Sequence, residues 1–211
     1  MLKSKSKRTF IRIGALAGWF AVVFQFILMI INREAGIPET VIRFFSFFTI
    51  LTNIIVSLCY TGLLMKPGSR MNTYFSNPKV IAAIAVYITV VGLIYNIVLR
   101  FMWDPVGLQL VVDELLHSFN PVWFVFFWFL FIDKSELQWK AVIRWLLYPL
   151  IYVIYVFIRG ALSGNYPYPF LDVTELGYTT SIINAFFVML VFMFFSLVYV
   201  GIGKVMSKRK G

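Results

Sequence analysis

Six long apolar stretches dominate the chain, and each is about as long as a helix that crosses a bilayer. A run of about 20 apolar residues spans the hydrocarbon core as a helix, because lipid offers no partner to a free backbone group. The six runs lie at residues 12–31, 44–64, 79–99, 109–131, 141–158 and 179–200. Because their connections are short, we predict a single all-α domain over residues 1–211, a polytopic membrane protein built as a bundle of six transmembrane helices.

The composition agrees with this class and excludes an ordinary soluble domain. The chain of 211 residues is 61% hydrophobic and only 13% charged, whereas soluble domains carry about 25% charged residues. Its single cysteine, Cys59, excludes an internal disulfide and a cysteine metal site.

Polar residues inside the apolar runs form stripes. In "FFSFFTILTNII" (residues 44–55), Ser46, Thr49 and Asn53 share one side of a helix that turns about 100° per residue. Similar stripes on the other runs contain Asn96 and Arg100; Asp113, Glu114 and His117; Tyr155 and Arg159; and Asn184. Polar groups in membrane helices face the bundle interior or a wet cavity, so we expect the stripes to converge.

The positive charges indicate which way the chain faces. The formal net charge is +10, and with a cytoplasmic N-terminus 15 of the 19 Lys and Arg residues fall on the inner side and 4 on the outer side. This is the positive-inside pattern, so we expect a cell-membrane protein with both termini cytoplasmic. The basic ends then set topology and contact anionic lipid, which argues against nucleic acid as a partner.

This orientation places the polar residues at one depth. Thr49 lies six residues beyond Arg43, about 9 Å into the membrane from the outer end, and His117 lies about 10 Å deep by the same helical rise. Arg100 and Arg159 end helices that run outward, whereas the inner half of the bundle is almost entirely apolar. The pattern predicts a pocket that opens outward or into the outer leaflet, and it disfavours a continuous ion path.

His117, the single histidine, is the strongest candidate for chemistry. A histidine titrates near neutral pH and can act as the general base that a hydroxyl nucleophile such as Thr49 requires. Asp113 precedes it by one helical turn and either orients the imidazole, like the third member of a triad, or pairs with Arg100 or Arg159.

Metal binding is the competing use of these side chains. "DELLH" (residues 113–117) offers two carboxylates and a histidine, and Asp172 and Glu175 follow in the last outer loop. Catalytic zinc sites usually hold two or three His or Cys ligands, and this chain has no further ligand of that kind to offer. We therefore expect no metal and no other cofactor.

Three motifs resemble a known family. "FFTILTN", "DELLHSFNP" and "RGALSGNYPYPFLD" occur in the order found in the androgen-induced and androgen-dependent family of six-helix membrane lipid hydrolases, and they look most like its microbial, Pr6Pr-type branch. The resemblance implies hydrolysis of fatty acid esters of hydroxy fatty acids by a catalytic threonine and histidine, which match Thr49 and His117. The proline-containing loop after the fifth run is either an aromatic cap at the membrane interface or a lid over the pocket.

The resulting expectation is an intramembrane hydrolase of lipid esters that takes its substrate from the bilayer. Thr49 is the expected nucleophile and His117 the base. The residues expected to bind or orient the substrate are Asn53, Asn96, Arg100, Asp113, Arg159, Tyr166 and Asn184. The alternatives are a lipid-binding or structural membrane protein without turnover and, less favoured, a small-solute transporter; the sequence defines no oligomeric state.

The topology can be tested directly. A reporter enzyme fused to the C-terminus should be active in the cytoplasm and inactive outside, because the positive charges retain both ends of the chain inside. Protease added to intact cells should leave the basic segment at residues 3–8 uncut. Cleavage of that segment from outside would reverse the assigned orientation and the depths derived from it.

Overall fold

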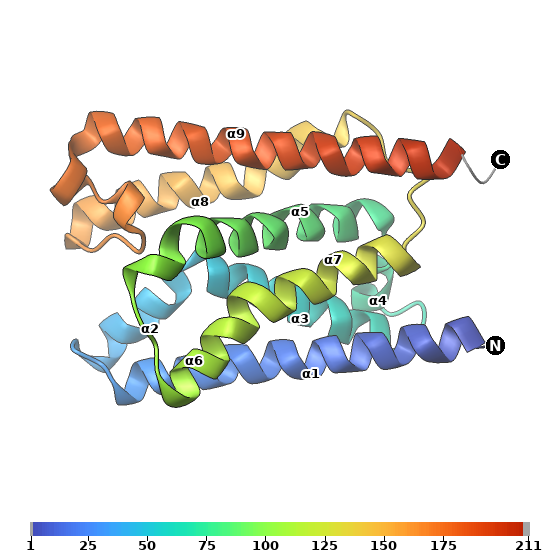
Figure 1. The fold of residues 1–211 in the computed structure, drawn as a ribbon, viewed down its shortest axis with the longest axis horizontal. Coiled ribbons are helices and arrows are strands. Elements are labelled where there is room, and N and C mark those ends of the chain that lie inside the picture. Colours follow the sequence, from blue (N-terminus) through green and yellow to red (C-terminus); the bar gives the residue numbers. More distant parts are fainter. Residues whose placement is uncertain (1, 209–211) are drawn as a thin grey trace.

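Long helices form a bundle in which the first helix begins, and the last helix ends, at the same end (Figure 1). The computed structural model describes residues 2–208 and contains no β-strand within that range. The α-helices are α1 (Leu2–Ile31), α2 (Ile37–Ser46), α3 (Phe48–Leu64), α4 (Arg70–Phe75), α5 (Pro78–Ile94), α6 (Gly107–Glu114), α7 (Asn120–Phe131), α8 (Ala141–Ser163) and α9 (Val173–Lys208). Two π turns, η1 (Tyr95–Leu99) and η3 (Leu115–Phe119), and two 3₁₀ turns, η2 (Arg100–Met102) and η4 (Pro169–Leu171), complete the order.

The helices confirm the predicted all-α, multi-pass membrane architecture. Among the described residues, five helical segments are long and apolar enough to cross a membrane, and the bent pair α2–α3 makes a sixth if it forms one span. The start of α1 and the end of α9 lie at the same end of the bundle, as an even number of spans requires (Figure 1). The connections α1–α2, η2–α6 and α8–α9 lie at the opposite end (Figure 1).

The second apolar run is not one helix, which corrects the first of the predicted stripes. Phe47 is extended, with φ −83° and ψ 124°, and α2 and α3 meet at 73°. Ser46 therefore ends one helix, while Thr49 lies in the first turn of the next. Apolar residues flank the break on both sides, so the hydrophobic pattern carries no sign of it.

Two further runs are continuous in sequence but contain a π turn, at the end of the first and within the second. The run predicted at 79–99 widens at η1 (Tyr95–Leu99), and the run predicted at 109–131 widens at η3 (Leu115–Phe119). A π turn adds a residue to the helical turn and is often found at functional sites. The close approach of α5 to α7 sets the two wide turns side by side: a Cβ on Gly92 would lie 2.9 Å from Pro121 and 3.3 Å from the carbonyl oxygen of His117.

Candidate functional site

A cavity of about 640 Å³ lies among the helix ends and loops opposite the termini. Its walls come from α1, the α1–α2 loop, α2, α3, η1, α6, η3 and the α8–α9 loop, and are mostly apolar. Thr49, Asp113 and His117 line it together, although they come from two different parts of the chain. The cavity therefore brings the nucleophile and base predicted from the sequence to the walls of a single space.

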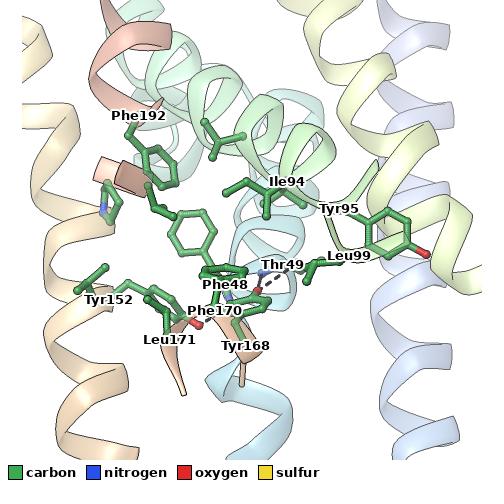
Figure 2. Close-up of a pocket in the computed structure, with 15 residues that line it drawn as sticks. Phe48, Thr49, Ile94, Tyr95, Leu99, Tyr152, Tyr168, Phe170, Leu171 and Phe192 are labelled. Atoms are coloured by element: carbon green, nitrogen blue, oxygen red, sulfur yellow. Dashed lines mark hydrogen bonds between the residues drawn. The ribbon is translucent and has the colours of Figure 1, made fainter. Parts of the chain in front are cut away.

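Thr49 is held by a residue of the α8–α9 loop. The hydroxyl of Tyr168 accepts a hydrogen bond from the Thr49 backbone N–H at 3.2 Å and lies 3.4 Å from the Thr49 hydroxyl (Figure 2). The Thr49 N–H is free for this contact because the break at Phe47 leaves it in the first helical turn. Burial raises the pKa of Tyr168 above its usual value, so this hydroxyl remains a proton donor at neutral pH.

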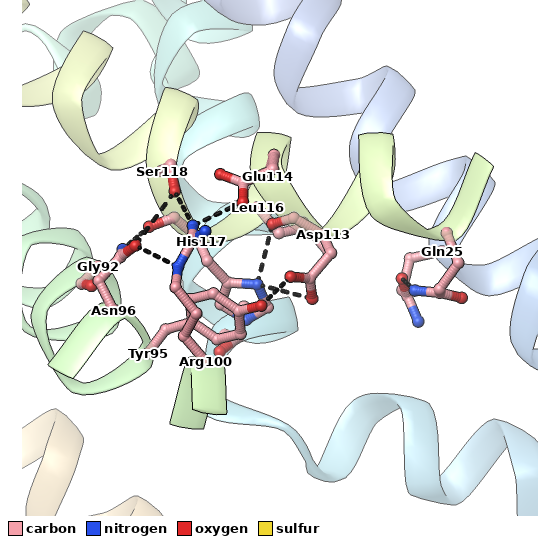
Figure 3. Close-up of polar contacts among 12 residues, drawn as sticks. Gln25, Gly92, Tyr95, Asn96, Arg100, Asp113, Glu114, Leu116, His117 and Ser118 are labelled. Atoms are coloured by element: carbon pink, nitrogen blue, oxygen red, sulfur yellow. Dashed lines mark hydrogen bonds and ion pairs between the residues drawn. The ribbon is translucent and has the colours of Figure 1, made fainter. Parts of the chain in front are cut away.

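His117 has a defined tautomer. Its Nδ1 atom lies 3.2 Å from the Asp113 carboxylate and 3.0 Å from the Asp113 carbonyl oxygen (Figure 3). Both neighbours are acceptors, so Nδ1 carries the proton, and in the uncharged ring Nε2 keeps its lone pair. In that form the ring can take a proton from a group in the cavity.

Tyr95 contacts both His117 and Asp113. Its ring stacks on the His117 ring, with centroids 3.8 Å apart and an interplanar angle of 13°. Its hydroxyl donates to the second oxygen of the Asp113 carboxylate. Asp113 is 2% exposed, and this buried carboxylate has the Tyr95 hydroxyl at one oxygen and His117 Nδ1 3.2 Å from the other, so it is not left without partners.

The two candidate arginines pair with carboxylates other than Asp113. Arg100 forms an ion pair with Glu114 at 2.6 Å (Figure 3), and Arg159 forms one with Glu39 at 2.5 Å. Neither arginine lines the cavity. Of the two partners considered for Asp113 in the sequence, a histidine or an arginine, the structure shows the histidine.

The candidate asparagines Asn53 and Asn96 donate hydrogen bonds to backbone carbonyl oxygens. Fully buried Asn53 donates to the carbonyl oxygens of Thr49 at 2.9 Å and of Leu116 at 3.2 Å, and it accepts from Asn120 at 2.8 Å. Asn96 donates to the carbonyl oxygens of Gly92 at 2.8 Å and of His117 at 3.1 Å. Together these amides fasten the π turn that carries the histidine, and neither lines the cavity.

The α8–α9 loop is fastened in the same manner. Asn184 donates to the carbonyl oxygen of Phe170 at 2.9 Å, and the Tyr166 ring packs so tightly on Gly160 that an added Cβ would lie 2.0 Å from it. Neither Tyr166 nor Asn184 lines the cavity. They hold the loop in the position where Tyr168, two residues beyond Tyr166, reaches Thr49.

Sequence reasoning missed two tyrosines that define the site. Tyr168 belongs to "YPYPF", where the loop signal was present but Tyr166 was the tyrosine chosen. Tyr95 precedes Asn96 in an apolar run, and it faces the cavity while Asn96 bonds to backbone. The polar stripe drew attention to Asn96, whereas no pattern marked the tyrosine beside it.

No group of three or more His, Cys, Asp or Glu residues within the described part of the chain is arranged to hold a metal ion. In "DELLH", Glu114 turns away from Asp113 and His117 to pair with Arg100. The competing metal interpretation of this motif therefore finds no ligand set in the geometry.

Comparisons with protein-family models, with curated proteins and with solved structures find no match to this chain. The resemblance carried by the three sequence motifs therefore stays an expectation. Support for a function comes from the arrangement of Thr49, Tyr168, His117 and Asp113.

The role of Asn53 leads to a prediction about stability. Asn53→Leu should lower the free energy of unfolding by about 1–3 kcal/mol, because it leaves the buried Leu116 carbonyl and Asn120 amide without partners. Thermal unfolding in detergent measures the loss. Asn184→Leu is the control, since it removes a single bond at a partly exposed position, and its effect should be smaller. Equal melting temperatures for Asn53→Leu and wild type would contradict this role.

Proposed function

We propose that the chain is an intramembrane hydrolase of lipid esters, with Thr49 as nucleophile and His117 as general base. The observation that carries the proposal is that both side chains line one cavity, while Asp113 lies at the Nδ1 atom of the imidazole. This arrangement supplies a hydroxyl, a base with its lone pair free, and a carboxylate that orients the base, which are the parts of a nucleophilic triad.

The proposed reaction has two steps, transfer of the acyl group to Thr49 and its hydrolysis. The Thr49 oxygen attacks the ester carbonyl carbon and its proton passes to His117 Nε2; the ester C–O bond then breaks, and the same proton goes to the departing alkoxide. The resulting acyl-Thr49 is attacked by water, whose proton also passes to His117. Collapse of this second intermediate releases the carboxylic acid and returns the proton to Thr49. Asp113 stabilises the imidazolium in each step.

The negative charge that develops on the carbonyl oxygen meets two donors beside Thr49. One donor is the Tyr168 hydroxyl. The other is the Thr49 backbone N–H, which in the free protein donates to the Tyr168 oxygen. Backbone and hydroxyl donors of this kind supply one of the largest contributions to acyl transfer. The start of α3 also carries the positive end of the helix dipole, which favours an anion at this position.

The setting of the cavity fits a lipid substrate. Its walls are largely apolar, with Arg33, Glu34 and Arg43 near the loops, so an alkyl chain can lie inside while polar groups face the membrane surface. We propose a cell-membrane location with cytoplasmic termini and the cavity in the outer half of the bilayer. The reaction needs no cofactor. A lipid-binding protein without turnover would use the same cavity, and the next experiment separates the two.

Thr49→Ala and His117→Ala should each abolish ester hydrolysis by the purified protein in liposomes, across a panel of acyl esters. Each loss should nearly equal that of the double variant, because residues that act as one unit are not additive. Thr49→Ser should retain part of the activity, since the hydroxyl remains.

Unchanged melting temperatures would show that the variants fold, and treatment with a chelator should leave the wild-type rate unaltered. Full activity in Thr49→Ala would refute the threonine mechanism. Loss of activity on chelation would favour a metal mechanism instead.

Tyr168→Phe should lower kcat by about 10²–10³-fold, because it removes one donor to the developing oxyanion. KM should change little, since the ring stays in place. Tyr166→Phe is the matched control: its ring packs on Gly160 and does not line the cavity, so its kcat should remain near the wild-type value. Similar losses in both variants would mean that the loop acts only as a structural cap.

A further inference from the structure

A second, smaller cavity of about 40 Å³ also has Thr49 in its wall (Figure 2). Four residues line both cavities: Thr49, Tyr95, Leu99 and Tyr168. Thr49 and Tyr168 thus belong to the walls of both cavities, and their hydroxyls lie 3.4 Å apart.

The small cavity suits an apolar group and offers little to water. Its remaining walls come mainly from aliphatic and aromatic side chains, among them Val91, Val188 and Phe192. The tyrosine hydroxyls around it already have partners, since that of Tyr152 donates to the Ser46 carbonyl at 2.8 Å and that of Tyr168 is bound to Thr49. A cavity without free polar partners stays dry and accepts apolar ligands.

The position of the base decides which arm of an ester enters which cavity. His117 and Asp113 line the large cavity but not the small one. After the first step the protonated His117 must deliver its proton to the departing alkoxide, so the alcohol arm has to lie on the side of His117. With the carbonyl carbon at Thr49, the acyl arm then extends to the opposite side.

We infer that the small cavity is an acyl subsite, and that the substrate is an ester of a short carboxylic acid with a long lipid alcohol. This inference rests on the proposed hydrolase function and narrows its substrate. A water molecule needs about 10–15 Å³ of such a volume, so 40 Å³ holds roughly three heavy atoms. An acetyl to butanoyl group fits that space. The large cavity of about 640 Å³ accommodates the alcohol and later admits the hydrolytic water.

The first test compares esters of one alcohol, hexadecanol, with acids from acetyl to hexadecanoyl, presented to the wild-type protein in liposomes. The acetyl to butanoyl esters should have the highest kcat/KM. Each further methylene should lower it by about tenfold until turnover is lost, in keeping with the size of single-methylene discrimination. A flat profile, or a maximum at long acyl chains, would overturn the acyl subsite.

Variants on the two cavities supply the matched comparison. Val91→Phe fills the small cavity and should cut butanoyl ester turnover at least tenfold more than acetyl ester turnover. Val91→Ala enlarges the small cavity and should shift the optimum to a longer acyl chain. Because this substitution removes little volume, it still tests the subsite if Val91→Phe does not fold. Leu28→Phe, which lines only the large cavity, should change the preference for alcohol length and leave the acyl profile as in wild type.

The outcomes separate the two proposals. If wild type hydrolyses esters and loses this activity in Thr49→Ala, but Val91→Phe and Val91→Ala leave the acyl profile unchanged, the acyl subsite is wrong and the hydrolase stands. If wild type hydrolyses no ester in the panel, the hydrolase proposal fails and the acyl subsite fails with it. Opposite shifts in the two Val91 variants would support both.

Discussion

Every backbone N–H and C=O inside a bilayer needs a partner from the protein, and this constraint shapes the site. A regular helix meets it alone, yet the chain departs from regular helix around the large cavity at Phe47, at η1 and at η3. Side chains replace the missing partners. Tyr152 and Tyr168 accept from the first N–H groups of α3, while Asn53 and Asn96 donate to carbonyls of η3.

These substitute partners come from distant parts of the chain, so the packing of the bundle and the geometry of the site depend on each other. Tyr152 comes from α8 and Tyr168 from the loop that follows it. Asn53 ties α3 to η3, and its oxygen ties both to α7 through Asn120. The position of His117 relative to Thr49 thus depends on two amides and on the Tyr152 hydroxyl, which need no contact with a substrate, and on Tyr168, whose hydroxyl is also the proposed donor to the oxyanion.

The sequence predicted the features that depend on regular periodicity. The spans follow from apolar length, with five helices long enough to cross a membrane and a sixth span if the bent pair α2–α3 is one. The equal depth of Thr49 and His117 assumed one straight helix from Arg43 to Thr49, which the break at Phe47 interrupts; it is the fold that places both residues on one cavity. The irregular features could not be predicted, because "FFSFFTILTN" has phenylalanines on both sides of the break and no proline or glycine to mark it, and a π turn leaves no composition signal. Arg100 and Arg159 were expected at the substrate, but Glu114 and Glu39, which neutralise them, lie on elements whose relative placement only the fold defines.

The break at Phe47 and the proposed chemistry have the same structural origin. In a continuous helix the Thr49 N–H would bond to a carbonyl four residues earlier and could not serve an oxyanion. The break frees this N–H and lets Tyr168 occupy it, between a large cavity that contains the base and a small one that does not. The family resemblance implies a substrate with a long acyl chain. The small cavity of about 40 Å³ at Thr49 has room only for a short one. Under the proposed mechanism, a threonine placed between unequal cavities would define both the reaction and the direction in which the substrate lies.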